Sequence, residues 1–153
     1  MKAQGILNTI NMPTISSVFI DTNVFVALED KRDSTHQKAI ELSEILLSQE
    51  NIRYITSSEV IAETMTVLSK KLGKEAVKIF LKKHKKSNIA EIFFDEDLYQ
   101  QTLKYFLEVK SKNTSFVDCS SVIAMKRNRI EAIFSFDEDF KKLGVKLLGD
   151  VIK

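Results

Sequence analysis

The sequence is poor in cysteine and histidine, the side chains on which many metal and redox sites depend. Cys119 is the only cysteine, which excludes a disulfide within the chain and a cysteine-rich zinc site. His36 and His84 are the only histidines, which argues against a histidine-rich metal centre. A metal ion bound by this chain would therefore have mostly oxygen ligands, the set that suits Mg²⁺ or Mn²⁺.

Glycine, proline and long apolar runs are also scarce. Four glycines and one proline are too few for a linker, and no glycine-rich phosphate-binding loop is present. No segment approaches the roughly 18 apolar residues that cross a bilayer, and the first residues lack the apolar core of a signal peptide. We expect a cytoplasmic protein with a single domain over residues 18–153. Residues 1–17 form either a flexible N-terminal arm or an extra edge element.

Short apolar runs alternate with longer amphipathic segments along the chain. Strands are predicted at 18–20, 52–56, 89–94, 132–136 and 145–149. Helices are predicted at 34–50, 59–71, 75–84, 96–110, 115–128 and 137–143. This alternation is typical of an α/β fold with a central parallel sheet and helices on both faces. Right-handed crossovers bring the carboxyl ends of such strands to one edge, where ligands bind in open α/β sheets.

Four carboxylates from distant parts of the chain fall at this edge or early in helices. Asp21 ends the first strand, and Asp137 follows the strand predicted at 132–136. Glu63 lies in the helix that follows the second strand, and Asp118 lies in the first turn of its helix. If these side chains converged, their like charges would repel strongly, and burial of an unpaired carboxylate costs several kcal/mol. One or two divalent cations would remove that repulsion.

Each of these acids has a simpler explanation or a rival nearby. An aspartate at a strand end, such as Asp21, is often a turn or cap residue. Glu63 falls away from the apolar stripe of its helix, so a solvated helix face accounts for it equally well, and Glu59 stands one turn earlier as an alternative. Asp137 and Asp139 occupy the same turn, and either could be the fourth acid.

Asp118 stands three residues after Ser115, which is the spacing of a helix capping box. However, the helix at 115–128 is apolar on nearly all sides and should be buried, so a carboxylate in its first turn needs a further reason. Ser135 and Glu138 have the same capping-box spacing. Each of the four acids is a weak signal by itself. Their combination and their order along the chain are what predict a metal site.

Four segments around these acids resemble, in their order, the PIN-domain nucleases. They are "VFIDTNVFVAL", "ITSSEVIAET", "SFVDCSSVIAM" and "IEAIFSFDEDF". The closest similarity is to the small single-domain VapC-like toxins of toxin–antitoxin pairs, and it covers residues 18–148. The resemblance implies a PIN-like, Rossmann-like α/β/α sandwich with a central parallel sheet.

The resemblance also implies a set of site residues. The catalytic and metal-binding acids of the family fall on Asp21, Glu63, Asp118 and Asp137. The positions that support the site fall on Thr22, Asn23 and Ser135, with Asp139 beside the fourth acid. No ligand position is missing, so we expect an active site.

The function that the resemblance implies is a metal-dependent endoribonuclease that hydrolyses RNA phosphodiester bonds with Mg²⁺ or Mn²⁺. As a toxin, it would form a homodimer through the helices at 59–84 and bind a cognate antitoxin. A housekeeping PIN nuclease in RNA maturation or decay is the alternative enzyme. A non-catalytic RNA-binding PIN domain is the alternative outside enzymes, and it predicts RNA binding without metal dependence.

The net charge of +2 names no partner, but basic residues are clustered locally. Eight lysines lie between Lys70 and Lys86, where they either contact phosphates or keep an exposed helix soluble. Lys126, Arg127 and Arg129 follow the Asp118 helix and are the preferred candidates for RNA contacts. No aromatic RNA-binding motif is present, so the sequence does not identify the bases that are read.

Overall fold

The computed structural model describes residues 14–152, which fold around a sheet of four parallel strands. The strands are β1 (Ser17–Ile20), β2 (Arg53–Ser57), β3 (Ile89–Ile92) and β4 (Ala132–Phe134). Their spatial order is β3-β2-β1-β4. The chain therefore adds strands on one side of β1 and then returns to its other side. This reversal of strand order opens a crevice at the carboxyl ends of β1 and β4.

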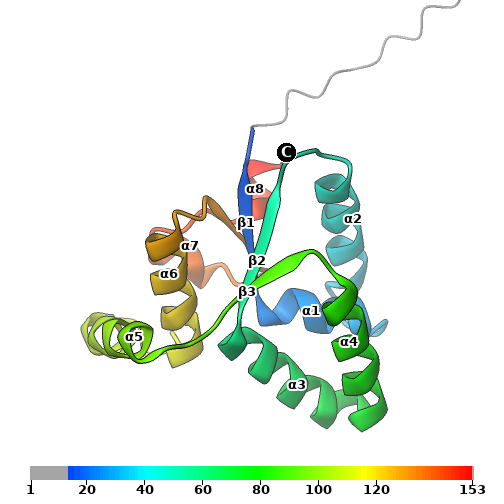
Figure 1. The fold of residues 1–153 in the computed structure, drawn as a ribbon, viewed down its shortest axis with the longest axis horizontal. Helices are drawn as coiled ribbons and strands as arrows, with labels where there is room; N and C mark the ends of the chain where they lie inside the picture. The colour runs from blue at the N-terminus through cyan, green and yellow to red at the C-terminus, as the bar shows by residue number, and fades with distance from the viewer. Residues whose placement is uncertain (1–13, 153) are drawn as a thin grey trace, which may run out of the picture.

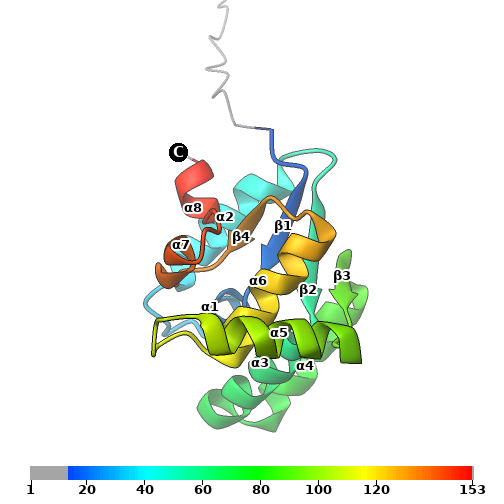
Figure 2. The ribbon, with the colours of Figure 1, turned by 90° about the vertical axis from the view of Figure 1, so that its left-hand side faces the viewer.

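Helices cover both faces of the sheet, as the α/β/α prediction requires. The helices are α1 (Thr22–Glu29), α2 (His36–Leu47), α3 (Ser58–Leu72), α4 (Lys74–Lys86), α5 (Glu96–Glu108), α6 (Phe116–Asn128), α7 (Asp139–Lys142) and α8 (Leu148–Val151). Helices α1, α2 and α4 lie on one side of the sheet, and α5, α6 and α7 lie on the other (Figure 1). Helix α3 runs past the lower ends of the strands in both views (Figures 1 and 2).

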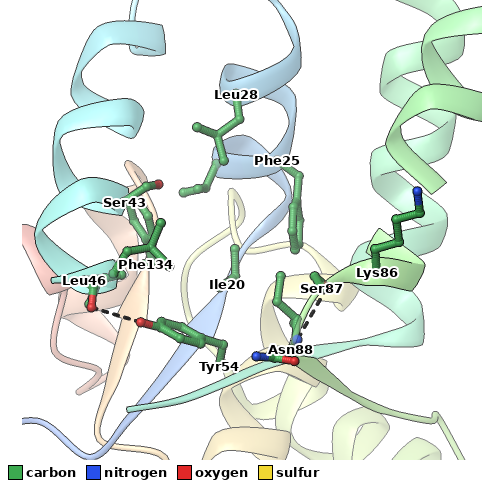
Figure 3. Close-up of a pocket in the computed structure, with 13 residues that line it drawn as sticks. Ile20, Phe25, Leu28, Ser43, Leu46, Tyr54, Lys86, Ser87, Asn88 and Phe134 are labelled. Atoms are coloured by element: carbon green, nitrogen blue, oxygen red, sulfur yellow. Dashed lines mark hydrogen bonds between the residues drawn. The ribbon is translucent and has the colours of Figure 1, made fainter. Parts of the chain in front are cut away.

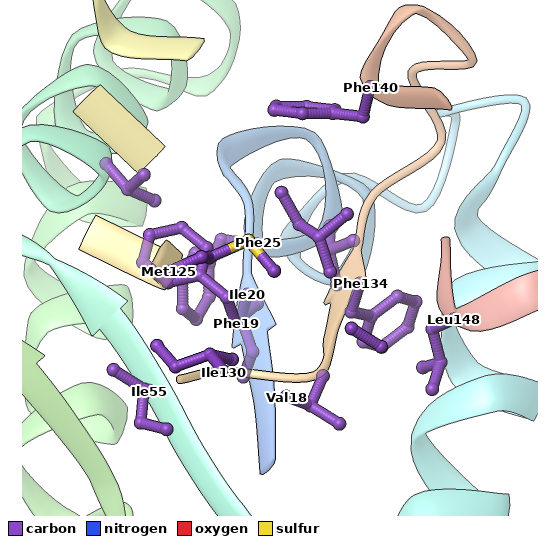
Figure 4. Close-up of a cluster of buried hydrophobic side chains, with 14 of the residues drawn as sticks. Val18, Phe19, Ile20, Phe25, Ile55, Met125, Ile130, Phe134, Phe140 and Leu148 are labelled. Atoms are coloured by element: carbon purple, nitrogen blue, oxygen red, sulfur yellow. The ribbon is translucent and has the colours of Figure 1, made fainter. Parts of the chain in front are cut away.

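The core is built on β1, the strand at the centre of the sheet. All four of its residues are buried, because a parallel strand covered by helices on both faces contacts apolar side chains on each side. Phe19, Phe134 and Leu148 are among the largest fully buried side chains, and Figure 4 shows them within one cluster that joins the sheet to the helices. Burial of each such side chain stabilises the fold by about 2–3 kcal/mol.

Side chains at the helix starts fix where several helices begin. Asp21 is the N-cap of α1 and accepts a hydrogen bond from the backbone N–H of Thr22. Ser57 caps α3 by accepting from the backbone N–H of Val60. The predicted capping box of α6 is confirmed: Ser115 and Asp118 each accept from the other's backbone N–H. The chain thus places two of the four acids at helix starts.

Two predictions about local structure are wrong. The strand predicted at 145–149 is reduced to a single bridge between Ile133 and Leu147, and the chain then enters α8. The capping box predicted from Ser135 and Glu138 is absent: the Ser135 hydroxyl faces Asp21 instead, and Glu138 precedes α7 without a side-chain cap. Helix α1, for which no element was predicted, is present directly after β1.

The domain boundary predicted at residue 18 falls inside β1, whose first residue is Ser17. Ile15 is buried in the core, and the Ser16 carbonyl accepts a hydrogen bond from Arg53. The rest of the predicted N-terminal arm, residues 1–13, lies outside the described residues. Within residues 14–152, no helix is both long and apolar enough to cross a bilayer.

Candidate functional site

The structure brings the four predicted acids to one pocket at the carboxyl edge of the sheet. The pocket has a volume of about 280 Å³. It is lined by Asp21, Thr22, Asn23, Val26, Asp33, Glu63, Val67, Lys71, Asp118 and Asp137. The acids come from the end of β1, from α3, from the first turn of α6 and from the segment after β4. Segments separated by more than a hundred residues thus supply one concave, acidic surface.

Asp21 occupies the most constrained position in this pocket. Its side chain is 5% exposed, with one oxygen accepting from the Thr22 N–H at 2.8 Å and the other from the Ser135 hydroxyl at 2.7 Å. Its pKa is raised from 3.8 to about 7: burial is the largest cause, the two hydrogen bonds lower the pKa, and the charges of Asp118 and Glu63 contribute to the rise. The fold therefore holds a carboxylate whose ionisation it disfavours, as expected for a group that awaits a cation.

Asn23 and Ser135 connect the Asp21 carboxylate to the segment after β4. The Asn23 amide donates to the Ser135 hydroxyl oxygen at 3.0 Å, and its oxygen accepts from the Phe136 N–H at 3.2 Å. The Ser135 oxygen also accepts from the Asp137 N–H at 3.1 Å. This network connects the segment that carries Asp137 to Asp21.

Glu63 rather than Glu59 lines the pocket. The hydroxyl of Thr22 donates to the Glu63 carboxylate at 2.5 Å, so the side chain of Glu63 is directed to the start of α1. The apolar residues of α3 pack into the core, with Val60, Ile61 and Leu68 buried. The face of α3 that carries Glu63 is therefore partly buried and borders the pocket.

Asp118 serves the fold and the pocket at the same time. One of its oxygens accepts from the Ser115 N–H at 2.9 Å, which closes the capping box of α6. Burial raises the pKa of Asp118 above its ordinary value, although the bonds with Ser115 lower it, and the charges of Asp137 and Asp139 raise it. The four acids thus affect one another electrostatically, as like charges at a common site do.

Asp137 lines the pocket, whereas Asp139 is not part of the lining. One Asp137 oxygen accepts from the Asp139 N–H at 2.9 Å, which holds the turn before α7. Asp139 pairs with Lys142 at 2.8 Å, so its charge is partly compensated within α7. These contacts favour Asp137 as the fourth acid.

The donor chemistry of this pocket suits a hard divalent cation. The ligand atoms available are carboxylate oxygens, and the pKa values of Asp21 and Asp118 are raised mainly by burial and further by the neighbouring acids, whose charge a cation would neutralise. In residues 14–152, no three acidic, histidine or cysteine side chains converge with metal-binding geometry. Each of the four carboxylates accepts a hydrogen bond from a protein donor.

Asp33 and Lys71 line the pocket but were not singled out as site residues from the sequence. Asp33 lies in the loop between α1 and α2, and Lys71 lies in the last turn of α3. Lys71 belongs to the lysine cluster at 70–86. It differs from the other lysines in following Glu63 and Val67 at four-residue steps, which places it on the face of α3 that carries Glu63. That spacing is the sequence signal that could have identified it.

The preferred RNA-contact residues, Lys126, Arg127 and Arg129, lie at the end of α6 opposite to Asp118. Arg127 is nine positions after Asp118, or about 14 Å along the helix axis. Arg127 pairs with Asp95 and Asp97, and the Lys126 ammonium lies 5.0 Å from the centre of the Tyr105 ring. None of the three lines the acidic pocket.

A second cavity of about 460 Å³ lies apart from the acids, between α1, α2, β2 and the end of α4 (Figure 3). Its walls are mainly apolar, with Phe25 and Leu28 directed into it from α1. The hydroxyl of Tyr54 donates to the Leu46 carbonyl at 3.0 Å and is therefore satisfied. None of the four predicted acids lines this cavity.

The order of strands, the crevice at β1 and β4 and the acids within it define a PIN-type nuclease fold. The family model described as "PIN domain" matches residues 18–146, most of the chain. The chain therefore belongs to the PIN-domain family, as its sequence motifs predicted.

Two comparisons lead to the same relative. The chain is 26% identical over 127 residues to the 23S rRNA-specific endonuclease VapC20 of Mycobacterium tuberculosis, covering 83% of this chain and 94% of the relative. The crystal structure of Mycobacterium tuberculosis VapC20, a toxin that cleaves the Sarcin-Ricin loop, matches with a TM-score of 0.74 and 25% identity. That match covers 84% of this chain and 95% of the other.

More distant structures share the fold. VapBC2 from Rickettsia felis, bound to a DNA fragment from its promoter, matches with a TM-score of 0.58 and 18% identity over 86% of this chain and 96% of that chain. FitAcB from Neisseria gonorrhoeae matches with a TM-score of 0.56 and 17% identity over 85% of this chain and 95% of that chain. These likenesses extend over nearly the whole described fold.

Proposed function

We propose that the chain is a metal-dependent endoribonuclease that acts as the toxin of a toxin–antitoxin pair. The observation that carries this proposal is the convergence of Asp21, Glu63, Asp118 and Asp137 on one pocket at the switch point of the sheet. Membership of the PIN family and the similarity to an rRNA-specific endonuclease support the reaction class. The reaction is hydrolysis of an RNA phosphodiester bond.

The four carboxylates would hold a Mg²⁺ or Mn²⁺ ion between them. Such an ion, when bound, stabilises charge on the phosphate oxygens and lowers the pKa of a water molecule. Asp21 is held in place for this task by Ser135 and by the start of α1, and Thr22 positions Glu63. Asn23 keeps the segment of Asp137 in register with Asp21. These contacts fix the segments that carry the acids relative to one another.

The experiment is incubation of the purified protein with total RNA that includes 23S rRNA, in the presence of Mn²⁺ or of EDTA, followed by mapping of the cut ends. We expect discrete cuts with Mn²⁺ and none with EDTA. The Asp21→Asn variant should lose at least about a hundredfold in rate, because loss of a ligand exceeds the cost of losing a supporting contact. Cleavage at the wild-type rate by Asp21→Asn, or in EDTA, would contradict the proposal.

A paired substitution tests which acid of the turn before α7 takes part. Asp137→Asn should reduce cleavage much more than Asp139→Asn, because Asp137 lines the pocket and Asp139 pairs with Lys142. The reverse order would assign the fourth acid to Asp139. Thermal unfolding of both variants shows whether either substitution acts through the fold.

The proposed protein partner is a cognate antitoxin. The similar structures from Rickettsia felis and Neisseria gonorrhoeae are VapBC and FitAcB assemblies. The acidic pocket presents carboxylates that a basic side chain of an antitoxin peptide would neutralise, and this contact would block access of RNA. Co-expression of the antitoxin should suppress both cleavage and growth arrest.

We also propose a homodimer, with α5 in its interface. Four large hydrophobic side chains are exposed on α5 and in the segment between β3 and α5: Phe93, Tyr99, Phe106 and Leu107. The family resemblance places the interface on the helix pair at 59–84. Among the described residues of that pair, Ile79 is the one large hydrophobic side chain that is exposed. Grouped apolar side chains of this size mark association surfaces.

A further inference from the structure

Lys71 is the single basic side chain that the structure describes in the lining of the acidic pocket. The proposed hydrolysis uses the carboxylates and leaves this lysine without a role. RNA carries a negative charge on each phosphate, and carboxylates repel it unless cations lie beside its path. A cation inside the pocket therefore bears directly on how the substrate enters.

Helix α3 aligns this cation with the acids. Glu63, Val67 and Lys71 follow one another at four-residue spacing, which places them on one face of the helix, and all three line the pocket. Lys71 lies about 12 Å along the helix axis from Glu63, since each residue adds about 1.5 Å. This distance separates Lys71 from the proposed site of hydrolysis but keeps it on the same surface.

The contacts of Lys71 within the protein are weak. Its ammonium lies 4.0 Å from a carboxylate oxygen of Asp33, and its side chain is 49% exposed. The other Asp33 oxygen accepts from the Thr35 N–H at 2.8 Å and from the Thr35 hydroxyl at 2.7 Å, so Asp33 has partners that do not depend on Lys71. An exposed ion pair of this kind contributes at most about 1 kcal/mol, and its cation is readily transferred to another anion.

We propose that Lys71 binds an RNA phosphate that flanks the scissile one, and that Asp33 holds the lysine in this position until RNA enters. This inference rests on the proposed nuclease function. It gives the substrate a path along α3, from the carboxylates toward the loop between α1 and α2. Lys71 is a binding residue in this scheme, so its contribution falls on substrate affinity and not on the chemical step.

The test compares Lys71→Gln with Lys70→Gln, which removes the same charge one position earlier on α3, outside the pocket lining. The probe is a short labelled single-stranded RNA, bound by each variant in the Asp21→Asn background so that it is not cut. Loss of one phosphate contact should weaken binding about fivefold at about 0.1 M salt and reduce the salt slope by about 0.7. Lys70→Gln should change affinity by less than about twofold, and Lys71→Arg should restore it.

Asp33→Asn separates this role from a structural one. The substitution removes the charge that faces Lys71 and keeps an oxygen for Thr35, so our proposal predicts RNA binding at least as tight as before. With cleavage-competent protein, Lys71→Gln should raise KM and leave kcat within about twofold. Equal effects of Lys71→Gln and Lys70→Gln, or an Asp33→Asn variant as weak as Lys71→Gln, would overturn the inference. Wild-type protein that neither binds nor cuts RNA would instead overturn the nuclease proposal on which it rests.

Discussion

Asp21 combines three tasks in one residue: it directly follows β1, caps α1 and lines the acidic pocket. The fold fixes it with hydrogen bonds from Thr22 and Ser135, yet burial and two neighbouring acids oppose its ionisation. This conflict between local stability and charge is typical of functional sites. It also makes the unliganded protein sensitive to pH.

The pKa of Asp21 predicts how the stability of the metal-free protein changes with pH. Because the pKa is raised from 3.8 to about 7 on folding, the folded state holds a proton that the unfolded state releases. Stability is therefore lost as the pH rises from about 4 to about 7, by up to about 4 kcal/mol. Asp21→Asn removes this loss, so in EDTA its melting temperature should exceed that of the wild type by more at pH 8 than at pH 4.

Thermal unfolding in EDTA at the two pH values measures this effect. Asp97→Asn is the control, because it removes an aspartate that is largely exposed. Mn²⁺ should raise the melting temperature of the wild type at pH 8 but not that of Asp21→Asn. If Asp21→Asn and Asp97→Asn shift the melting temperature alike at both pH values, ionisation of Asp21 does not destabilise the fold and the prediction is wrong.

The sequence was sufficient to place the four acids but not their contacts. Asp21 and Asp137 were predicted at strand ends, where parallel strands must bring them together. In contrast, residue spacing predicted that the hydroxyl of Ser135 caps a helix, whereas the family resemblance placed Ser135 beside the site; the hydroxyl donates to Asp21. The partner of the Ser135 hydroxyl depends on the rotation of its side chain, and residue spacing carries no information about that rotation.

Among the elements, α1 shows where sequence patterns stop being informative. Residues 22–29 contain Val24, Phe25 and Val26, which favour strands, and they show no polar face because most of them are buried. The start of α1 depends on the Asp21 cap and on packing against α2 and α3. Conversely, the apolar run at 145–149 looked like a strand, but it makes only the one bridge to Ile133. In both segments, tertiary packing and not local sequence preference determines the secondary structure.

The junction of α3 and α4 depends on Gly73. Its φ of +89° and ψ of 176° fall in a region that is essentially restricted to glycine. A Cβ at this position would meet nothing within 4 Å, so a substitution acts through backbone strain and not through a clash. Gly73→Ala should therefore destabilise the protein by about 1–3 kcal/mol, or roughly 2–10 °C in melting temperature.

Gly149→Ala is a matched control for this prediction. Gly149 lies in α8, has no positive φ, and has equally open space around a Cβ. Alanine is favoured over glycine in a helix, so this substitution should leave the melting temperature unchanged or raise it slightly. A neutral Gly73→Ala would show that the junction tolerates another backbone conformation.

At the scale of the whole molecule, the α5 surface predicts the oligomeric state. Leu107 is 75% exposed, so Leu107→Glu should fold normally. If α5 forms the dimer interface, this variant should associate at least about tenfold more weakly, because a charge would be buried against apolar side chains. Sedimentation equilibrium measures the change directly.

Leu47 on α2 is also 75% exposed, and Leu47→Glu is therefore the control. It should leave association unchanged. A monomeric wild-type protein would contradict the homodimer, and equal weakening by both variants would place the interface elsewhere.

The described chain enters and leaves the fold on the side opposite to its acids. Thr14 precedes β1 and Ile152 follows α8, and both views place these ends together near the start of β1 (Figures 1 and 2). The carboxylates lie at the other end of that strand. A surface tether joined directly at Ile152 would consequently start on the side of the molecule away from the acidic pocket. Immobilisation at this point would leave the pocket facing the solution.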